Sequence, residues 1–173
     1  MNANIFRPIK LGKEVFHPQS YDDNTFIMLY TLEKKVGVPP HVHVHMDERF
    51  IIQWGEMTFM LNGKKIVKKS GEEFFVPKGQ THAINNTGTE QVIMTVTYSP
   101  CADTHRMFQV FSSLDEKSPD SIINMMKYFY IYPKLGWKEF SAIQPPAMNM
   151  LMKVIVNIIG KLSGWNKLVN QFR

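Results

Sequence analysis

The feature that most constrains the fold is the spacing of turn residues over the first 100 positions. Short segments rich in Val, Ile, Phe, Thr and Tyr alternate with turn residues about every eight to ten positions, which is typical of an all-β sandwich or barrel. Asn62-Gly63 predicts a tight hairpin, because both residues tolerate the positive φ angles of a type I′ turn. The expected strands are residues 25–32, 49–54, 57–61, 65–68, 73–76 and 91–98.

After Pro100 the apolar period lengthens towards that of a helix. Ser118-Pro119-Asp120 predicts the start of a helix that ends near residue 130, and Pro145-Pro146 predicts a second one. We therefore expect a mainly β chain, with a barrel domain over residues 1–112 and a helical extension over residues 113–173. The extension would pack on the barrel or on a partner subunit in a homodimer.

The second expected helix has a second interpretation. Its apolar stripe runs from Met148 to Leu162 and is accompanied by Lys153, Lys161 and Lys167. A basic amphipathic helix of this kind also fits the surface of a membrane. No run of about 18 uncharged apolar residues exists, so no membrane-spanning helix is expected.

Composition excludes several classes of protein. The single cysteine, Cys101, cannot form an internal disulfide, and residues 1–10 carry charge and a proline where a signal peptide needs an apolar stretch. A cytoplasmic location is therefore expected. The net charge of +5 includes a lysine cluster at residues 64–69, but no basic reading helix accompanies it. We expect these lysines to protect a sheet edge, and we expect no nucleic-acid partner.

The first of two polar stretches contains His41, His43, His45 and Glu48. Residues i and i+2 of a strand point to the same face, so His41 and His43 can place two imidazoles side by side, and His45 joins them if the strand stays regular. Glu48 lies an odd number of positions from His41 and His43, so in a regular strand its side chain would point to the opposite face. A turn or bulge around residues 46–47 is needed to bring its carboxylate inward.

The second polar stretch runs from Gly71 to Asn86. A strand enters a turn at Pro77-Lys78-Gly79, and the next strand carries His82 near its start. This hairpin can bring a third imidazole against the first two. Three histidines and one glutamate suit iron, manganese, nickel, copper or zinc better than calcium or magnesium, so we expect one divalent transition metal.

The two stretches resemble the two signature motifs of the cupin superfamily. The second matches at every defining place, which are Gly71, Pro77, Gly79, His82 and Asn86. The first matches through His41, His43, Glu48 and Gly55, with four residues between the second histidine and the glutamate. Gly37 departs from the pattern, because the five residues that should separate the glycine from the first histidine separate it here from His43 rather than from His41. Counting from Gly37 would let His45 replace His41 as a ligand.

The resemblance implies a jelly-roll barrel, or double-stranded β-helix, with the metal inside. The opening Pro39-Pro40-His41-Val42-His43 is most similar to that of quercetin-dioxygenase-like single-domain cupins, here followed by a helical C-terminal extension. This implies a dioxygenase-like oxidoreductase that acts on a small enolic or aromatic substrate, with Glu48 as metal ligand and general base. The candidate substrate pocket is His45, Phe50, Ile52, Trp54, Met60 and Phe74. The alternatives are a metal-dependent isomerase and a non-catalytic cupin that binds or senses a small molecule.

Overall fold

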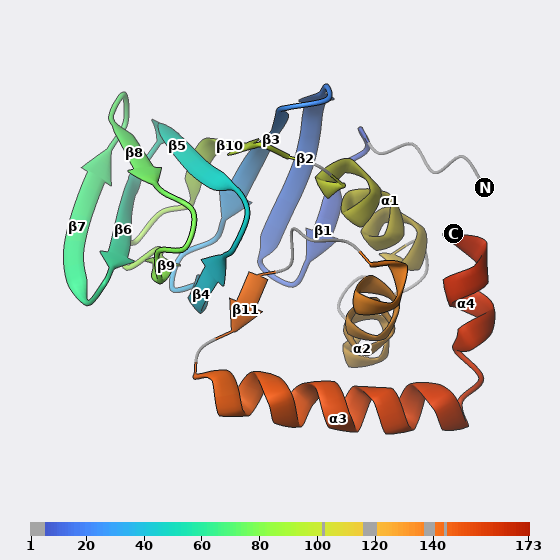
Figure 1. Cartoon of the computed structure of the whole chain (residues 1–173). Helices are drawn as coiled ribbons and strands as arrows, with labels where there is room; N and C mark the ends of the chain where they lie inside the picture. The colour runs from blue at the N-terminus through green and yellow to red at the C-terminus, as the bar shows by residue number, and fades with distance from the viewer. Residues whose placement is uncertain (1–5, 102, 116–120, 137–140, 144) are drawn as a thin grey trace.

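A computed structural model describes residues 6–101, 103–115, 121–136, 141–143 and 145–173 of the chain. Within these residues the strands form two antiparallel sheets, and the helices lie to one side of them (Figure 1). The helix start expected at residues 118–120 lies outside the described part. The mainly β fold with C-terminal helices is confirmed.

The two sheets interleave along the sequence. Among the described residues, one sheet has six strands in the order β1 (Ile9–Leu11), β2 (Glu14–Tyr21), β3 (Phe26–Leu32), β10 (Val92–Ser99), β5 (Asp47–Trp54) and β8 (Glu73–Val76). The other has five, in the order β11 (Ser141–Ile143), β4 (Gly37–His43), β9 (His82–Asn85), β6 (Glu56–Leu61) and β7 (Lys64–Lys69). The chain changes sheet between β3 and β4 and again between β4 and β5, as a double-stranded β-helix requires.

The six strands expected from the sequence are present within one or two residues of their predicted ends. The hairpin between β6 and β7 has positive φ at both Asn62 (49°) and Gly63 (80°), which confirms the predicted turn. β7 lies at the edge of its sheet, and its lysines are exposed or half-buried. This placement agrees with an edge-protecting role for the lysine cluster.

The barrel encloses an aromatic and methionine-rich core. Residues of β3 and β10 alternate between buried and half-buried positions, because successive side chains of a strand point to opposite faces of the sheet. The rings of Phe50, Phe59 and Phe74 pack against one another, with centroids 4.9 Å apart for the first pair and 4.4 Å for the second. These contacts bring β5, β6 and β8 together across the interior.

The C-terminal part contains α1 (Thr104–Asp115), α2 (Ile122–Ile131), the short 3₁₀ helix η1 (Tyr132–Leu135), α3 (Pro146–Leu162) and α4 (Asn166–Gln171). Pro145 is the N-cap of α3, which confirms the start predicted for this helix. The helices form a second core around Tyr130, Ile131 and Val156. Met107 and Phe111 of α1 pack against both cores and so join the helices to the barrel.

The predicted division at residue 112 falls within α1 and stays a prediction. The extension also reaches back to the barrel, because β11 pairs with β4. No helix in the described part of the chain is long and apolar enough to cross a membrane.

A single methyl group added at Gly160 is expected to destabilise the helical core. A Cβ there would lie 2.1 Å from Cδ2 of the Tyr130 ring. That ring cannot easily move, because its hydroxyl donates to Asn166 Oδ1 at 2.7 Å and its edge packs on Trp165. We expect Gly160→Ala to lower the free energy of unfolding by about 1–3 kcal/mol through overpacking.

Chemical denaturation followed by far-UV circular dichroism measures this change. A glycine-to-alanine change inside an unobstructed helix raises stability by about 1 kcal/mol, so the sign of the effect tests the contact. Met150→Ala, at an exposed position of the same helix, is the matched control and is expected to change stability little. A more stable Gly160→Ala variant would contradict the close packing of Gly160 on Tyr130.

Candidate metal centre

The first polar stretch is divided between the two sheets. His41 and His43 lie at the end of β4, and the chain leaves this sheet over residues 44–46 before it joins the other sheet as β5. The crossing supplies the change of direction that Glu48 needs, and its side chain points inward with the residue 4% exposed. His45 lies in the crossing and is exposed, because the regular strand ends before it.

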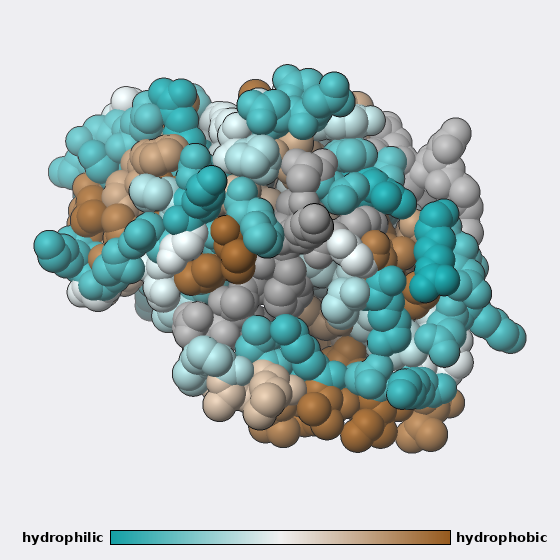
Figure 2. All heavy atoms as spheres, viewed as in Figure 1, coloured by the Kyte–Doolittle hydropathy of each residue, from teal (hydrophilic) through white to brown (hydrophobic). Residues whose placement is uncertain are grey.

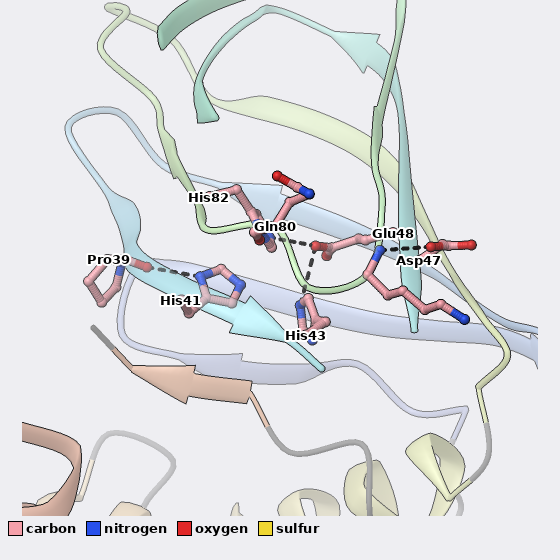
Figure 3. Close-up of polar contacts among 8 residues, drawn as sticks. Pro39, His41, His43, Asp47, Glu48, Gln80 and His82 are labelled. Carbon is pink, nitrogen blue, oxygen red and sulfur yellow. Dashed lines mark hydrogen bonds and ion pairs between the residues drawn. The ribbon is translucent and has the colours of Figure 1, made fainter. Parts of the chain in front are cut away.

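The third histidine is placed by the pairing of β4 with β9, in which His41 and His82 are directly opposite. The turn between β8 and β9 is also tied to the first polar stretch (Figure 3). The backbone N–H of Gly79 donates to the His43 carbonyl at 2.8 Å, and that of Lys78 donates to Asp47 Oδ1 at 2.7 Å. The proline-glycine turn therefore fixes where β9 begins, and with it the position of His82.

Four side chains converge at this point. One nitrogen each of His41, His43 and His82 and one carboxylate oxygen of Glu48 all lie within 4.8 Å of one another. Glu48 Oε2 is 2.9 Å from His82 Nε2 and 3.3 Å from His43 Nε2 (Figure 3). The cluster is the set predicted from the spacing, with His41 rather than His45.

Backbone carbonyls determine which nitrogen of two of these rings is available. Nδ1 of His41 is 2.9 Å from the Pro39 carbonyl oxygen, and Nδ1 of His82 is 3.1 Å from that of Gln80. A carbonyl oxygen only accepts hydrogen bonds, so both Nδ1 atoms carry the proton and donate. Nε2 is then the atom left to ligate, and each ring is held in orientation by its carbonyl, as is usual for metal-binding histidines.

The donor set and its surroundings fit a divalent transition metal. Three imidazole nitrogens and one carboxylate oxygen are ligands of zinc, iron, nickel, copper and manganese sites. With four protein ligands, an octahedral ion keeps about two positions for water, O₂ or substrate. The described cluster is therefore able to hold one metal ion.

Without an ion, the negative charge of Glu48 is balanced by a proton that it shares with His82. Burial opposes ionisation of Glu48, but the neighbouring His43 and His82 hold its pKa well below the usual range. Burial also disfavours a charged His82, yet the hydrogen bond and charge of Glu48 leave the pKa of His82 raised. Burial, with the nearby His82, lowers the pKa of His41 to about 4. The proton that a metal must displace therefore lies between His82 and Glu48.

The affinity for metal is expected to fall as pH decreases through the raised pKa of His82. Above that pKa the imidazole is neutral and binds directly; below it the ion must expel a proton, so the affinity falls by about tenfold per pH unit. His41, with a pKa of about 4, is neutral at pH 6 and above and contributes no competition there.

Isothermal titration calorimetry with Zn²⁺ in two buffers of different ionisation enthalpy measures both the affinity and the protons released. The account predicts about one proton released per ion at the lower end of the range from about pH 6 to pH 8. An affinity that does not change with pH over that range would contradict the assignment.

Tyr98 is a site residue that the sequence reasoning missed. It is directly opposite Glu48 in the pairing of β10 with β5, and its ring centroid is 5.4 Å from that of His43. Burial and the neighbouring Glu48 carboxylate raise the pKa of Tyr98 well above its usual value, so the phenol stays protonated beside Glu48. The only signal in the sequence was its place in the strand expected over residues 91–98, whose register is not readable from sequence.

The predicted pocket residues have different surroundings. Phe50 and Ile52 are each 1% exposed and Phe74 is 7% exposed, so these three belong to the barrel interior. Met60 is half-buried on β6. Trp54 is 56% exposed at the end of β5 and, like His45, lies outside the buried cluster. A role in binding substrate stays a prediction for all six residues.

Comparisons with known proteins agree with this architecture. Residues 28–98 match the family model for the cupin domain. An uncharacterized protein of Aquifex aeolicus (strain VF5) is 33% identical over 69 residues, a match that covers 40% of this chain and 56% of that protein. The match therefore spans little more than half the length of this curated relative.

Two solved structures show the same fold. KdgF from Halomonas sp. has a TM-score of 0.53 at 15% identity, over 57% of this chain and 89% of that chain. A predicted oxalate decarboxylase from Thermotoga maritima has a TM-score of 0.51 at 21% identity, over 57% of this chain and 96% of that chain. The solved structures and the two interleaved sheets agree on a jelly-roll fold, and residues 28–98 of the chain are similar to the cupin domain.

Proposed function

We propose that this chain is a metal-dependent cupin in which His41, His43, Glu48 and His82 hold one divalent transition metal, and that it acts as a dioxygenase-like oxidoreductase on a small enolic or aromatic substrate. The observation that carries the metal site is the hydrogen bond from Nδ1 of His41 and of His82 to a backbone carbonyl. These two bonds leave Nε2 of both rings directed at the cluster. The dioxygenase assignment rests on the ligand set and on the resemblance to quercetin-dioxygenase-like cupins.

A redox-active ion held by these residues would polarise the enol oxygen and mediate electron exchange with O₂. Glu48 would offer a carboxylate oxygen that can take the proton of the substrate hydroxyl when the enolate forms. Tyr98 lies opposite Glu48 in the pairing of β10 with β5, and its protonated phenol can donate to the same carboxylate and orient it. Phe50 and Ile52 follow Glu48 along β5 on its buried face and keep the interior apolar beside it.

One observation favours a second candidate, a cupin that senses a small molecule. β11 pairs with β4 in a register that places Ser141 opposite His43 and Ile143 opposite His41. The strand that carries two of the four candidate ligands is therefore bonded to the segment that leads into α3. A change at the ligands can reach the helices through this pairing without any turnover.

An oxygen-uptake assay separates these candidates. The full-length protein is stripped with a chelator, loaded in separate samples with Fe²⁺, Mn²⁺, Ni²⁺, Cu²⁺ or Zn²⁺, and assayed with an oxygen electrode against a panel of flavonols, enediols and 1,3-diketones. The proposal predicts substrate-dependent uptake with at least one redox-active ion, none with Zn²⁺, and none in the His82→Ala variant. Chemical conversion of a substrate by the Zn²⁺ form without O₂ would identify an isomerase. Binding of a panel compound with no turnover by any metal form would support the sensing alternative.

A further inference from the structure

The outward face of α3 is an apolar surface with no partner in the part of the chain that the structure describes. Figure 2 shows it as a continuous brown band along the lower edge of the molecule, where α3 lies in Figure 1. Its members expose between 40% and 84% of their surface. They are Met148, Met150, Leu151, Met152, Val154, Ile155, Ile158 and Leu162, and we call them the α3 outer face.

The opposite side of the same helix is already occupied. Val156 and Gly160 are buried against α2 and α4, where Gly160 packs on the Tyr130 ring. The polar residues of α3 form one stripe at four-residue spacing, Asn149, Lys153, Asn157 and Lys161, so the helix is amphipathic with an apolar face that points outward. The contacts within the helical core account for one side only.

The size of the α3 outer face exceeds that of scattered surface hydrophobics. Eight neighbouring apolar side chains on one helix expose several hundred square ångströms, which is the scale at which a patch on a soluble protein marks an interaction site. The face is also a ridge rather than a groove, since it follows the outside of a single helix at the edge of the molecule (Figure 2). A ridge of this kind fits a partner surface that can deform around it.

The charge around the face indicates what that partner is. The described helices α2, η1, α3 and α4 contain basic residues but no acidic ones. In the sequence no Asp or Glu follows Glu139, whereas Lys153, Lys161, Lys167 and Arg173 do. The helices α2, η1, α3 and α4 are therefore basic, without acidic residues, beside the α3 outer face.

A second copy of the chain would bring two such basic surfaces together with no acidic group on these helices to pair with either. An anionic lipid surface supplies both complements, acyl chains for the apolar ridge and negative headgroups for the lysines. We propose that α3 docks in the plane of an anionic membrane surface, with its outer face buried at the boundary between headgroups and acyl chains.

Docking of this kind would act on the candidate metal centre through one short connection. Only residues 144 and 145 separate β11 from α3, and β11 pairs with the strand that carries His41 and His43. A membrane that holds α3 therefore also holds the β11–β4 pair near its surface.

Vesicle flotation with the full-length protein tests the proposal. The probes are vesicles of phosphatidylcholine alone and vesicles that also contain phosphatidylglycerol, each at low and at high salt. The protein is expected to float with the anionic vesicles at low salt, and binding is expected to weaken at least tenfold in the Leu151→Glu/Ile158→Glu variant, because two large apolar side chains are lost from the buried face. Lys161→Glu/Lys167→Glu is expected to weaken binding and to reduce its dependence on salt.

Val67→Glu is the matched control, since Val67 is an apolar residue 40% exposed on β7, away from the helices. It is expected to bind anionic vesicles like the parent protein, and circular dichroism checks that each variant is folded. No flotation of the parent protein, equal flotation of the Leu151→Glu/Ile158→Glu variant, or equal binding to phosphatidylcholine alone would overturn the proposal. So would a dimer in sedimentation velocity that this variant dissociates and that anionic vesicles do not displace.

Discussion

Glu48→Gln is expected to lower the affinity of the protein for a divalent transition metal by at least about a hundredfold. Loss of a group that merely orients a ligand costs about ten- to a hundredfold in affinity, and Glu48 is the one carboxylate in the described cluster. An amide keeps the shape of the side chain but has no charge to offer the ion. A competition titration of the stripped protein against a coloured chelator, with Zn²⁺ and with Mn²⁺, measures the change.

The matched control for this variant is Glu73→Gln. Glu73 lies on β8, is exposed, and pairs with Arg49 at the surface, so its loss is expected to leave metal affinity unchanged. The Glu48→Gln protein is expected to fold, because the imidazoles beside it can release their protons when the carboxylate is gone. Equal affinities for the parent protein and the Glu48→Gln variant would show that the cluster is not the metal site.

Gly37→Ala is expected to lower both stability and metal affinity. Gly37 is opposite Asn85 in the pairing of β4 with β9, and a Cβ there would lie 2.3 Å from the Ile84 carbonyl oxygen and 2.3 Å from Asn85 Oδ1. One of these atoms belongs to the backbone, so the two strands must separate. We expect a loss of about 2–3 kcal/mol in the free energy of unfolding, at the upper end of the usual cost of overpacking.

Separation of β4 from β9 would also move the candidate ligands apart, because β4 carries His41 and β9 carries His82. The Gly37→Ala variant is therefore expected to bind metal more weakly while still folded. Gly63→Ala is the control: a Cβ there meets open space, and only its positive φ of 80° costs energy, about 1 kcal/mol. If Gly37→Ala lost stability but kept its metal affinity, the close approach of β4 to β9 at Gly37 would not be needed to position the metal ligands, which would contradict this prediction.

The departure of Gly37 from the expected motif has a structural reason in this contact. In the motif five residues separate the glycine from the first histidine, whereas here five residues separate Gly37 from His43. In the structure a Cβ at Gly37 would lie 2.3 Å from the Ile84 carbonyl oxygen of β9, so the close approach of β4 to β9 at this point requires glycine. The glycine is thus explained by packing, and the ligands follow from the spacing of His41, His43 and Glu48.

Local pattern was sufficient for the features that depend on neighbours in sequence. The alternation of His41 and His43 along one strand and the turn signals at Asn62-Gly63 and Pro77-Lys78-Gly79 involve residues within a few positions of one another. The inward turn of Glu48 was expected from its parity alone. The pairing that brings His82 to His41 was expected from the hairpin and is present.

Features that depend on long-range register were not predictable in the same way. Tyr98 contacts Glu48 only because β10 pairs with β5 in one register out of several, and no local pattern selects it. β11 has three residues and pairs with a strand about 100 positions earlier, so its short segment carries no signal of its own. Trp54 fits the inward alternation of β5 but lies at its end, where the sheet no longer covers it.

The metal content of protein purified without an affinity tag tests the central claim most directly. Inductively coupled plasma mass spectrometry would be run on the parent protein and on His82→Ala, after each has been incubated with a mixture of divalent metals and passed through a desalting column. The account predicts close to one transition-metal ion per chain in the parent protein and a large loss in the variant, with circular dichroism showing that the variant is folded. No metal in the parent protein, or the same metal content in a folded His82→Ala protein, would contradict a metal centre at His41, His43, Glu48 and His82.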